Sequence, residues 1–395
     1  MPYRPGLATI LRSAAISLAA LGCRDVVGGG PAAGANRIAW VVSDIRSPLS
    51  AGSLAVDSQS VYLYRDGRSI SAVRLSDHAI LWTAVGDETF NSVFPLKGIV
   101  RCQDQIVFGS YLAVYAVAPE TGRRRWKWGP SIGGDVTRGA PVCDGATLYF
   151  GVGKPAMLYA VDAVTGREKW VARLGRIPGV DGFVTTPSVS DGVVVVCTRE
   201  FTVPARGMIA GVDAATGQVK WEYTWTPPPS RPDASCAVNV AARNGIAVGS
   251  ADDGRIFGLD VQSGAVRWTA PEVAGFGTPR DERPVWIVDG VVMAGSLSGV
   301  VTGLDLATGR ELWKAAATTP RTLTTIIGPI VGDRGQFVGV TISGSAYGYE
   351  AATGKEQWTV TYGRDVNERK LFGPGALTPD LFLVIGSDGL YAIRR

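Results

Sequence analysis

Short apolar runs alternate with polar turns along most of the chain, and residues 139–170 give the clearest example. Two apolar segments come first, GAPVCDG and TLYFGVG, and AMLYAVDAV follows with apolar and polar positions in alternation. Alternation of this kind predicts β-strands that bury one face. A turn and a last strand with Trp170 complete the unit, so the pattern predicts four short strands in about 45 residues.

This unit recurs, and a tryptophan marks its last strand each time. Successive tryptophans are separated by 42 residues (Trp40 to Trp82) at the least and by 51 residues (Trp170 to Trp221) at the most. The eight tryptophans are Trp40, Trp82, Trp126, Trp170, Trp221, Trp268, Trp313 and Trp358. A steady period in this range, with four strands per repeat, is typical of the blades of a β-propeller.

The two ends of the repeat region predict how the ring closes. After Trp358 the segments KLFGPGALTPD, LFLVIGSD and GLYAIRR provide three strands, and NRIAWVVSD near the other end carries Trp40 without a preceding repeat. We expect the strand around Trp40 to be the fourth strand of the last blade, because this leaves no sheet open. The prediction is an all-β, eight-bladed propeller over residues 37–395, closed by an N-terminal strand.

The first 36 residues differ from the rest. Residues 1–23 contain arginines followed by a ten-residue apolar stretch, which suits a signal peptide and is too short to span a bilayer. The stretch ends in Ala-Ala-Leu-Gly-Cys, which resembles a degenerate bacterial lipobox and implies lipidation of Cys23. Residues 24–36 are rich in Gly, Ala and Pro, and we expect a flexible tether there.

Four further cysteines fall in successive predicted blades: Cys102, Cys143, Cys197 and Cys236. They occupy non-matching positions, so a disulfide would have to cross between sheets. We therefore expect buried free thiols rather than disulfides, although an exported chain would permit disulfides.

A turn motif before the tryptophan resembles the docking motif of the PQQ-type (quinoprotein-like) propellers. In AVDAVTGREKW, Ala160, Asp162, Thr165, Gly166 and Trp170 match that motif at every position. The resemblance covers residues 37–395 and implies that each tryptophan docks between neighbouring blades. Besides the eight tryptophans, the docking set comprises Asp162, Gly166, Asp213, Gly217, Asp260, Gly264, Asp305, Gly309 and Gly354.

Two groups within this superfamily imply different functions. Quinoprotein dehydrogenases bind pyrroloquinoline quinone and calcium on the propeller axis, and many have an adjacent cysteine pair that this chain lacks. Lipoproteins of the BamB type are eight-bladed rings of about this length behind a lipidated cysteine, and they act in outer-membrane β-barrel assembly. Length, leader and blade count are more similar to the BamB type.

The residues themselves display no catalytic constellation. His78 is the one histidine, and it occupies the glycine position of a turn, so we expect an exposed turn residue rather than a catalytic base. Asp252-Asp253-Gly254 is interpreted as a hairpin turn rather than a calcium site. The net charge of +4 is small, and Arg123–Arg125 is the one dense basic run, so no nucleic-acid groove is indicated. We predict no catalytic, cofactor or metal residues, and a protein that is not an enzyme.

The longest repeat indicates where partners bind. It contains CTREFTVPARG (Cys197–Gly207), predicted as a loop between the second and third strands of blade four, and YTWTPPPSRPD, predicted as the start of the next blade. Both insertions are expected on one face in adjacent blades, where loops carry binding functions. Their aromatic, proline and arginine side chains give the candidate interface Phe201, Trp225, Pro228 and Arg231.

The leading hypothesis is an exported, lipid-anchored scaffold that binds proteins. As in lipoproteins of the BamB type, its expected partner is a β-barrel assembly complex. Its expected place is the periplasmic side of an outer membrane, or the outer surface of a single membrane. Two alternatives stay open: a PQQ- and calcium-dependent dehydrogenase or PQQ-binding relative, and an envelope propeller that binds a ligand or polysaccharide in its central funnel.

Overall fold

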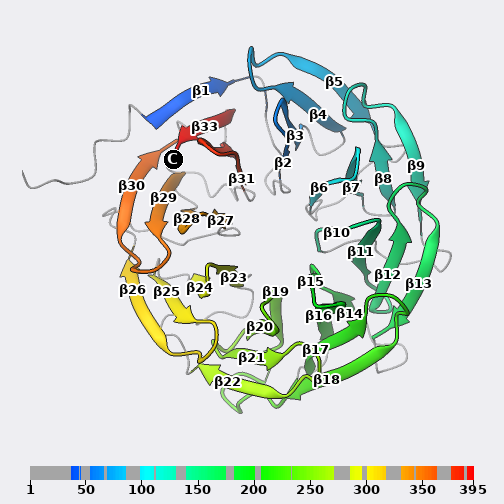
Figure 1. Ribbon diagram of the computed structural model, residues 1–395, viewed down its shortest axis with the longest axis vertical. Helices are drawn as coiled ribbons and strands as arrows, with labels where there is room; N and C mark the ends of the chain where they lie inside the picture. The colour runs from blue at the N-terminus through cyan, green and yellow to red at the C-terminus, as the bar shows by residue number, and fades with distance from the viewer. Residues whose placement is uncertain are drawn as a thin grey trace, which may run out of the picture.

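The computed structural model describes residues 37–43, 45, 54–65, 69–85, 98–110, 113–129, 139–174, 182–200, 206–232, 234–270, 285–295, 300–316, 331–341, 344–362, 375–386 and 389–395. These residues form eight antiparallel sheets arranged in a ring around a central axis (Figure 1). The prediction of an all-β, eight-bladed propeller is confirmed. The predictions for residues 1–36, including Cys23, concern residues outside the described ones, and Phe201 also lies outside them.

In blades one to seven the strands run outward from the axis in chain order. Blade one contains β2 (Ala55–Val56), β3 (Ser60–Tyr64), β4 (Ser69–Arg74) and β5 (Ile80–Val85). Blade two contains β6 (Ile99–Cys102), β7 (Gln105–Gly109), β8 (Val114–Val117) and β9 (Arg124–Trp128). Blade three contains β10 (Val142–Asp144), β11 (Thr147–Val152), β12 (Met157–Asp162) and β13 (Glu168–Arg173).

Blade four differs because two short strands, β14 (Gly182–Val184) and β15 (Ser188–Ser190), both pair with β16 (Val193–Glu200). It continues with β17 (Arg206–Asp213) and β18 (Val219–Trp225). Blade five contains β19 (Cys236–Arg243), β20 (Ile246–Ala251), β21 (Ile256–Asp260) and β22 (Val266–Ala270). Blade six contains β23 (Val285–Val288), β24 (Val291–Gly295), β25 (Val300–Asp305) and β26 (Glu311–Ala316). Blade seven contains β27 (Val331–Asp333), β28 (Gln336–Val340), β29 (Ser345–Glu350) and β30 (Glu356–Thr361).

Blade eight joins the two ends of the repeat region. It contains β31 (Ala376–Leu377), β32 (Leu381–Ile385), β33 (Leu390–Arg394) and, outermost, β1 (Ile38–Val42). The pairing of β1 with β33 is antiparallel, with Trp40 opposite Ala392 and Val42 opposite Leu390. The predicted closure by an N-terminal strand is therefore confirmed.

The hydrophobic core is divided into eight clusters, each formed by the facing sides of two adjacent blades. The cluster between blades two and three combines Trp126 and Trp128 with Phe150 and Tyr159, for example. Because every sheet buries both faces, the inner strands are nearly continuous apolar runs, and polarity alternates mainly in the outermost strand.

The repeated tryptophans lie against the turn of the next blade. A Cβ added at Gly166 would lie 2.7 Å from the Trp126 ring, and one added at Gly217 would lie 2.7 Å from the Trp170 ring. These glycines have φ of 70° and 77°, so the position requires both a left-handed backbone and a bare α-carbon. Burying an indole of roughly 200 Å² stabilises the ring by about 5 kcal/mol per blade junction.

Each indole N–H also crosses to the next blade. Trp126 Nε1 donates to the carbonyl of Ala163 at 3.1 Å, and Trp221 Nε1 donates to that of Val261 at 2.8 Å. The indole N–H groups of four other tryptophans donate to the carbonyl at the same position in the turn of the next blade: Trp82, Trp170, Trp268 and Trp313. This bond satisfies the polar atom of a side chain that is otherwise buried.

The two tryptophans at the closing blade are held differently. Trp358 faces blade eight, whose third and fourth strands come from opposite ends of the chain, and its Nε1 has no hydrogen-bond partner. Arg37 lies over its ring at 5.6 Å. Trp40 stacks on His78 with 4.4 Å between ring centroids. His78 has φ of 62° and is half-buried, so it takes the turn position of the glycines but is not simply exposed.

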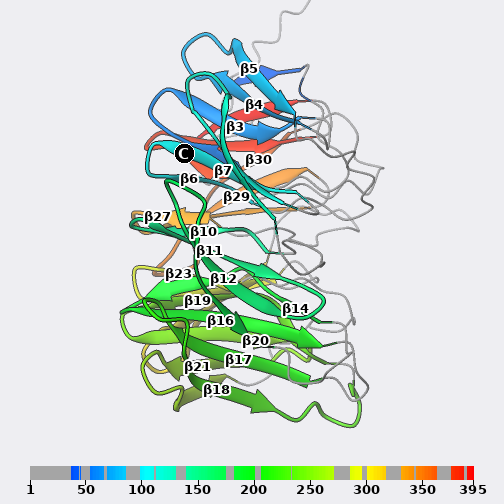
Figure 2. The ribbon, with the colours of Figure 1, turned by 90° about the vertical axis from the view of Figure 1, so that its right-hand side faces the viewer.

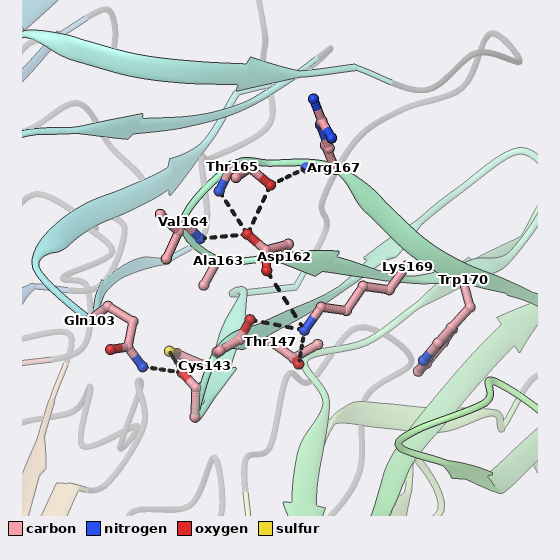
Figure 3. A network of polar contacts seen from close by, with 12 residues as sticks. Gln103, Cys143, Thr147, Asp162, Ala163, Val164, Thr165, Arg167, Lys169 and Trp170 are labelled. Atoms are coloured by element: carbon pink, nitrogen blue, oxygen red, sulfur yellow. Dashed lines mark hydrogen bonds and ion pairs between the residues drawn. The ribbon is translucent and has the colours of Figure 1, made fainter.

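The aspartate of each turn organises the backbone around it. Asp162 Oδ1 accepts hydrogen bonds from the N–H groups of Val164 and Thr165, and from the Thr165 hydroxyl at 2.8 Å (Figure 3). The hydroxyl bond, followed by the backbone bonds, holds the pKa of Asp162 below its usual value. The pKa is lowered by the same arrangement at Asp213 and Asp305, and at Asp260 a bond from Arg267 lowers it to about 2.

The ring has two unlike faces, because the strands of each blade alternate in direction. We call the face with the Asp162–Gly166 turn and its equivalents the turn face, and the face with the Ala251–Arg255 turn the loop face. Figure 2 shows the disc from the side, with the ends of β16 and β17 that lie nearest Glu200 and Arg206 on the loop face.

The expectation of free thiols is wrong. Cys102 and Cys143 form a disulfide with 5.5 Å between their α-carbons, and Cys197 and Cys236 form another with 6.1 Å. Each bond joins adjacent blades, two to three and four to five. The distance between the two sheets is short at these cysteines, because strands near the axis of a propeller lie close to those of the neighbouring sheet.

Candidate functional site

The most irregular described region lies where blades four and five meet at the loop face. β16 and β17 pair in register as far as Glu200 opposite Arg206, so most of the predicted loop is strand. β18 continues to Trp225, which pairs with Gly207. Trp225 therefore belongs to the outermost strand of blade four, and its assignment to the start of the next blade was wrong.

The Trp225 ring is fixed by its neighbours. Its centroid lies 5.2 Å from that of Phe257 and 6.2 Å from that of Tyr223. Any β-carbon at Gly207 would overlap the Trp225 ring, so the glycine permits this close approach. The ring is half-buried, and its Nε1 is shielded from solvent without a hydrogen-bond partner.

A buried carboxylate lies beside this aromatic cluster. The Asp252 side chain is 1% exposed, and its Oδ2 lies 3.1 Å from a guanidinium nitrogen of Arg199. The backbone N–H of Ser235 donates to the same oxygen at 3.4 Å, and Arg231 donates to the Asp252 carbonyl at 3.3 Å. A buried charge is tolerated only with such partners, because desolvation otherwise costs several kcal/mol.

The next residue forms a second ion pair. Arg255 donates to Asp253 Oδ2 through Nε at 3.0 Å and through a terminal nitrogen at 2.6 Å. The same guanidinium donates to the Thr226 carbonyl at 3.1 Å, and it lies 5.6 Å from the Phe257 ring. Arg255 thus fastens the chain segment between the two blades to the hairpin of blade five.

We call the set Arg199, Trp225, Arg231, Ser235 and Asp252 the blade four–five seam. Two of its donors, the Trp225 indole and the Ser235 hydroxyl, have no hydrogen-bond partner although both are shielded. Arg199 remains 21% exposed beside its carboxylate. Carbonyl or carboxylate groups of a partner would suit these two donors and the exposed part of the Arg199 guanidinium.

The seam is built on a covalent crosslink. Cys197 lies two residues before Arg199 on β16, and Cys236 directly follows Ser235. Both cysteines are fully buried, in the cluster that also contains Phe257 and the partly buried Trp225. The disulfide therefore fixes the spacing of the two strands that carry the polar groups.

The predicted interface residues that can be placed lie together. Pro228 is half-buried, and its carbonyl accepts a hydrogen bond from the Arg231 N–H at 2.8 Å, so both belong to one turn beside Trp225. Arg199, Ser235 and Asp252 were missed as interface residues. The composition of the segment from Cys197 to Gly207 could have indicated Arg199, but its pairing with Asp252, 53 positions away (252 minus 199), could not be read from the sequence.

The described part of the chain contains no group of three or more His, Cys, Asp or Glu side chains that could hold a metal ion. Asp252 and Asp253 are each engaged with arginine, and Gly254 completes a turn with φ of 96°. The described residues thus do not provide a fit for the calcium of a quinoprotein site. Nor do they include any helix long and apolar enough to cross a bilayer.

The ring of eight sheets with tryptophan-docking turns defines a propeller of the PQQ type. More specifically, the chain belongs to the family of the outer membrane protein assembly factor BamB, whose family model matches residues 110–299 and 297–392.

Individual relatives include both assembly factors and enzymes. BamB from Moraxella catarrhalis has a similar structure, with a TM-score of 0.63 and 13% identity over 90% of this chain and 98% of that one. The structure of the quinohemoprotein alcohol dehydrogenase from Comamonas testosteroni also has a TM-score of 0.63 with 13% identity, over 90% of this chain and 76% of that one. At these identities the likeness concerns the fold alone.

The sequence of the Comamonas testosteroni enzyme is 32% identical over 189 residues, which cover 44% of this chain but only 26% of the enzyme. This relative overturns the prediction that the chain is not an enzyme, because the similarity extends to a named dehydrogenase. The matched part is about a quarter of that enzyme's length.

Proposed function

We propose that this protein is a cell-envelope scaffold that docks a protein partner at the blade four–five seam, in a β-barrel assembly complex of the BamB type. The observation that supports this most directly is the pair of shielded, unpartnered donors beside two arginines on a disulfide-braced surface. Aromatic and arginine side chains of this kind often dominate binding energy. Membership of the BamB family favours this class of partner.

The test is recovery of β-barrel assembly components from detergent-solubilised envelopes with the tagged full chain. Arg231→Ala is expected to lower recovery by more than about tenfold, since arginines at interface centres contribute about 2 kcal/mol or more. Its control is Arg243→Ala at the exposed end of β19, which should leave recovery unchanged. No recovery of assembly components by the unaltered chain would contradict the proposal.

A finer variant addresses the indole donor. Trp225→Phe keeps the aromatic stack but removes the N–H, and it is expected to weaken binding about fivefold, the value of about one hydrogen bond of 1 kcal/mol. Trp286→Phe is the matched control, because the indole nitrogen of Trp286 in blade six also lacks a partner. Equal effects of the two variants would remove Trp225 from the interface.

The anchor is a separate part of the proposal. We infer that residues 1–23 are a signal peptide, that Cys23 is lipidated, and that the mature protein faces the periplasm from the outer membrane. Mass spectrometry of the mature N-terminus decides this. A diacylglyceryl group on Cys23 supports the anchor, whereas an unmodified or uncleaved terminus rules it out.

A second candidate, a PQQ-dependent dehydrogenase, is favoured by the 32% identity to the quinohemoprotein alcohol dehydrogenase. The test adds PQQ and calcium to the purified chain and measures bound chromophore and alcohol-dependent dye reduction. Binding with turnover would establish the dehydrogenase, and binding without turnover would indicate a cofactor-binding relative.

A further inference from the structure

Exposed cationic side chains gather on the outer strands of blades two and three. We call this set the basic rim, and its members are Arg123, Arg124, Arg125, Lys127, Arg167, Lys169 and Arg173. Exposed or half-buried acidic residues on these outer strands and on the turns before them are fewer: Glu120, Asp162 and Glu168. The outermost strand of blade one, ILWTAV, contains no charged residue, so the enrichment is local.

The fold joins these two strands into one surface. Trp126 of β9 donates its indole N–H to Ala163 at 3.1 Å and packs on Gly166, just before Arg167. Figure 1 shows β9 and β13 next to each other on the outside of the ring. In the sequence, the run of residues 123–125 and the cations of blade three are about 40 positions apart.

Part of the basic charge is neutralised within the protein. Arg125 forms an ion pair with Asp104 at 2.7 Å, and Lys169 lies 4.0 Å from Asp162 while donating to Thr147 at 2.8 Å. Figure 3 shows the Arg167 side chain directed away from the Asp162 network, which it meets only through its backbone N–H.

Three guanidinium groups are left over. Those of Arg123, Arg167 and Arg173 make no ion pair or hydrogen bond within the part of the chain that the structure describes. Each of the three adds positive charge to the basic rim, and this charge would attract an anionic partner.

The surroundings favour lipid over other anions. Val164 and Val171 lie among the cations and are 54% and 40% exposed. A convex rim that combines unpaired arginines with exposed valines suits a membrane interface, where cations meet phosphates and apolar groups enter the headgroup layer. A groove with stacking aromatics, as single-stranded nucleic acid requires, is not what these two outer strands provide.

We propose that the basic rim rests on an anionic phospholipid surface. This contact is separate from the blade four–five seam, which lies at the loop face of other blades. With the rim of blades two and three against the bilayer, the seam would remain accessible to a protein partner. The proposal also does not depend on a lipid at Cys23.

The test measures partitioning of the full chain onto vesicles, with Cys23→Ser in every variant so that no acyl chain contributes. Vesicles of phosphatidylcholine alone are compared with vesicles containing phosphatidylglycerol. Each basic residue near an anionic membrane raises partitioning about fivefold, so Arg123→Ser, Arg167→Ser and Arg173→Ser together should lower it about 100-fold on the anionic vesicles.

The control removes three exposed cations elsewhere: Arg243→Ser, Arg310→Ser and Lys355→Ser. Arg310 and Lys355 occupy the same repeat position in blades six and seven as Arg167 in blade three. Both triple variants change the net charge from +4 to +1 (4 minus 3). The control should keep most of the anionic binding.

Further outcomes decide the proposal. Replacing the same three rim arginines by lysine should retain binding, which separates charge from misfolding. Equal losses in both serine triples would show a net-charge effect and overturn the proposal. Equal binding to both kinds of vesicle would also overturn the proposal. So would binding to neither kind of vesicle while an acidic protein binds the basic rim.

Discussion

The contact between a tryptophan and the next blade's turn glycine can be tested by two alanine substitutions in blade four. Gly217 and Gly192 have nearly the same backbone, with φ of 77° and 74°. A Cβ at Gly217 would lie 2.7 Å from the Trp170 ring, whereas one at Gly192 would meet nothing within 4 Å. The pair therefore separates backbone strain from the blade-to-blade contact.

The expected free energies follow from this difference. Alanine in the left-handed region costs about 1–2 kcal/mol at either position. Gly217→Ala must also displace a ring that is 9% exposed and whose N–H bonds to Ala214, and overpacking of that kind costs about 1–3 kcal/mol more. Urea unfolding of the oxidised chain, followed by circular dichroism, should show Gly217→Ala as the more destabilising by that amount.

A double-mutant cycle tests the cause. In a Trp170→Ala background the obstructing ring is absent, so Gly217→Ala should cost only as much as Gly192→Ala does. The reasoning is refuted if the two glycine substitutions cost the same in the original chain. It is also refuted if the extra cost of Gly217→Ala persists without Trp170.

Three further outcomes are expected from the turns, the crosslinks and the closing blade. In the folded chain the pKa of Asp260 is lowered to about 2, against about 3.9 in the unfolded chain, so the carboxylate stabilises the fold above about pH 4 and this stabilisation is lost as the pH falls to about 2. Asp260→Asn should therefore reduce the loss of stability that an acid titration measures between these two pH values. Dithiothreitol without denaturant should reduce Cys102–Cys143 before Cys197–Cys236, because Cys143 is partly exposed while both members of the second pair are buried. Alkylation of the released thiols, followed by peptide mass mapping, measures the order of reduction. His78→Gly should remove the contact with Trp40 but relieve the left-handed backbone, so the free energy of unfolding should change by less than about 1 kcal/mol; a larger loss would show that the stack dominates closure.

The architecture could be predicted from the sequence because its signals are local and repeated. A turn aspartate, a left-handed glycine and a tryptophan occur within nine residues, from Asp162 to Trp170, and the contacts they make are the same at junction after junction. Trp40 indicated closure for the same reason. It has a strand pattern but no turn of its own, so it must complete a sheet begun elsewhere.

The disulfides and the seam depend instead on distances between blades. Cys197 and Cys236 are 39 positions apart, and nothing local indicates that β16 and β19 approach closely at those residues. Trp225 was misplaced because the proline-rich run shortly after it, Pro227–Pro229, resembles the start of a new blade, whereas β18 continues to pair with β17 as far as Trp225 opposite Gly207. Pairing across a hairpin is a tertiary preference that outweighs local composition.

The repeated turns stabilise the ring, whereas the blade four–five seam has the properties of a recognition surface. At the turn face the polar groups satisfy one another: the aspartates bond to their own turns, and most of the docked indoles bond to the next blade. At the blade four–five seam, shielded donors remain unpartnered on strands that a buried disulfide holds together. A crosslink closing a loop of about 40 residues stabilises by about 4 kcal/mol in the chain-entropy account, enough to keep such costly donors ordered. A surface that is already rigid loses less entropy on binding, so the crosslink raises affinity without touching the partner.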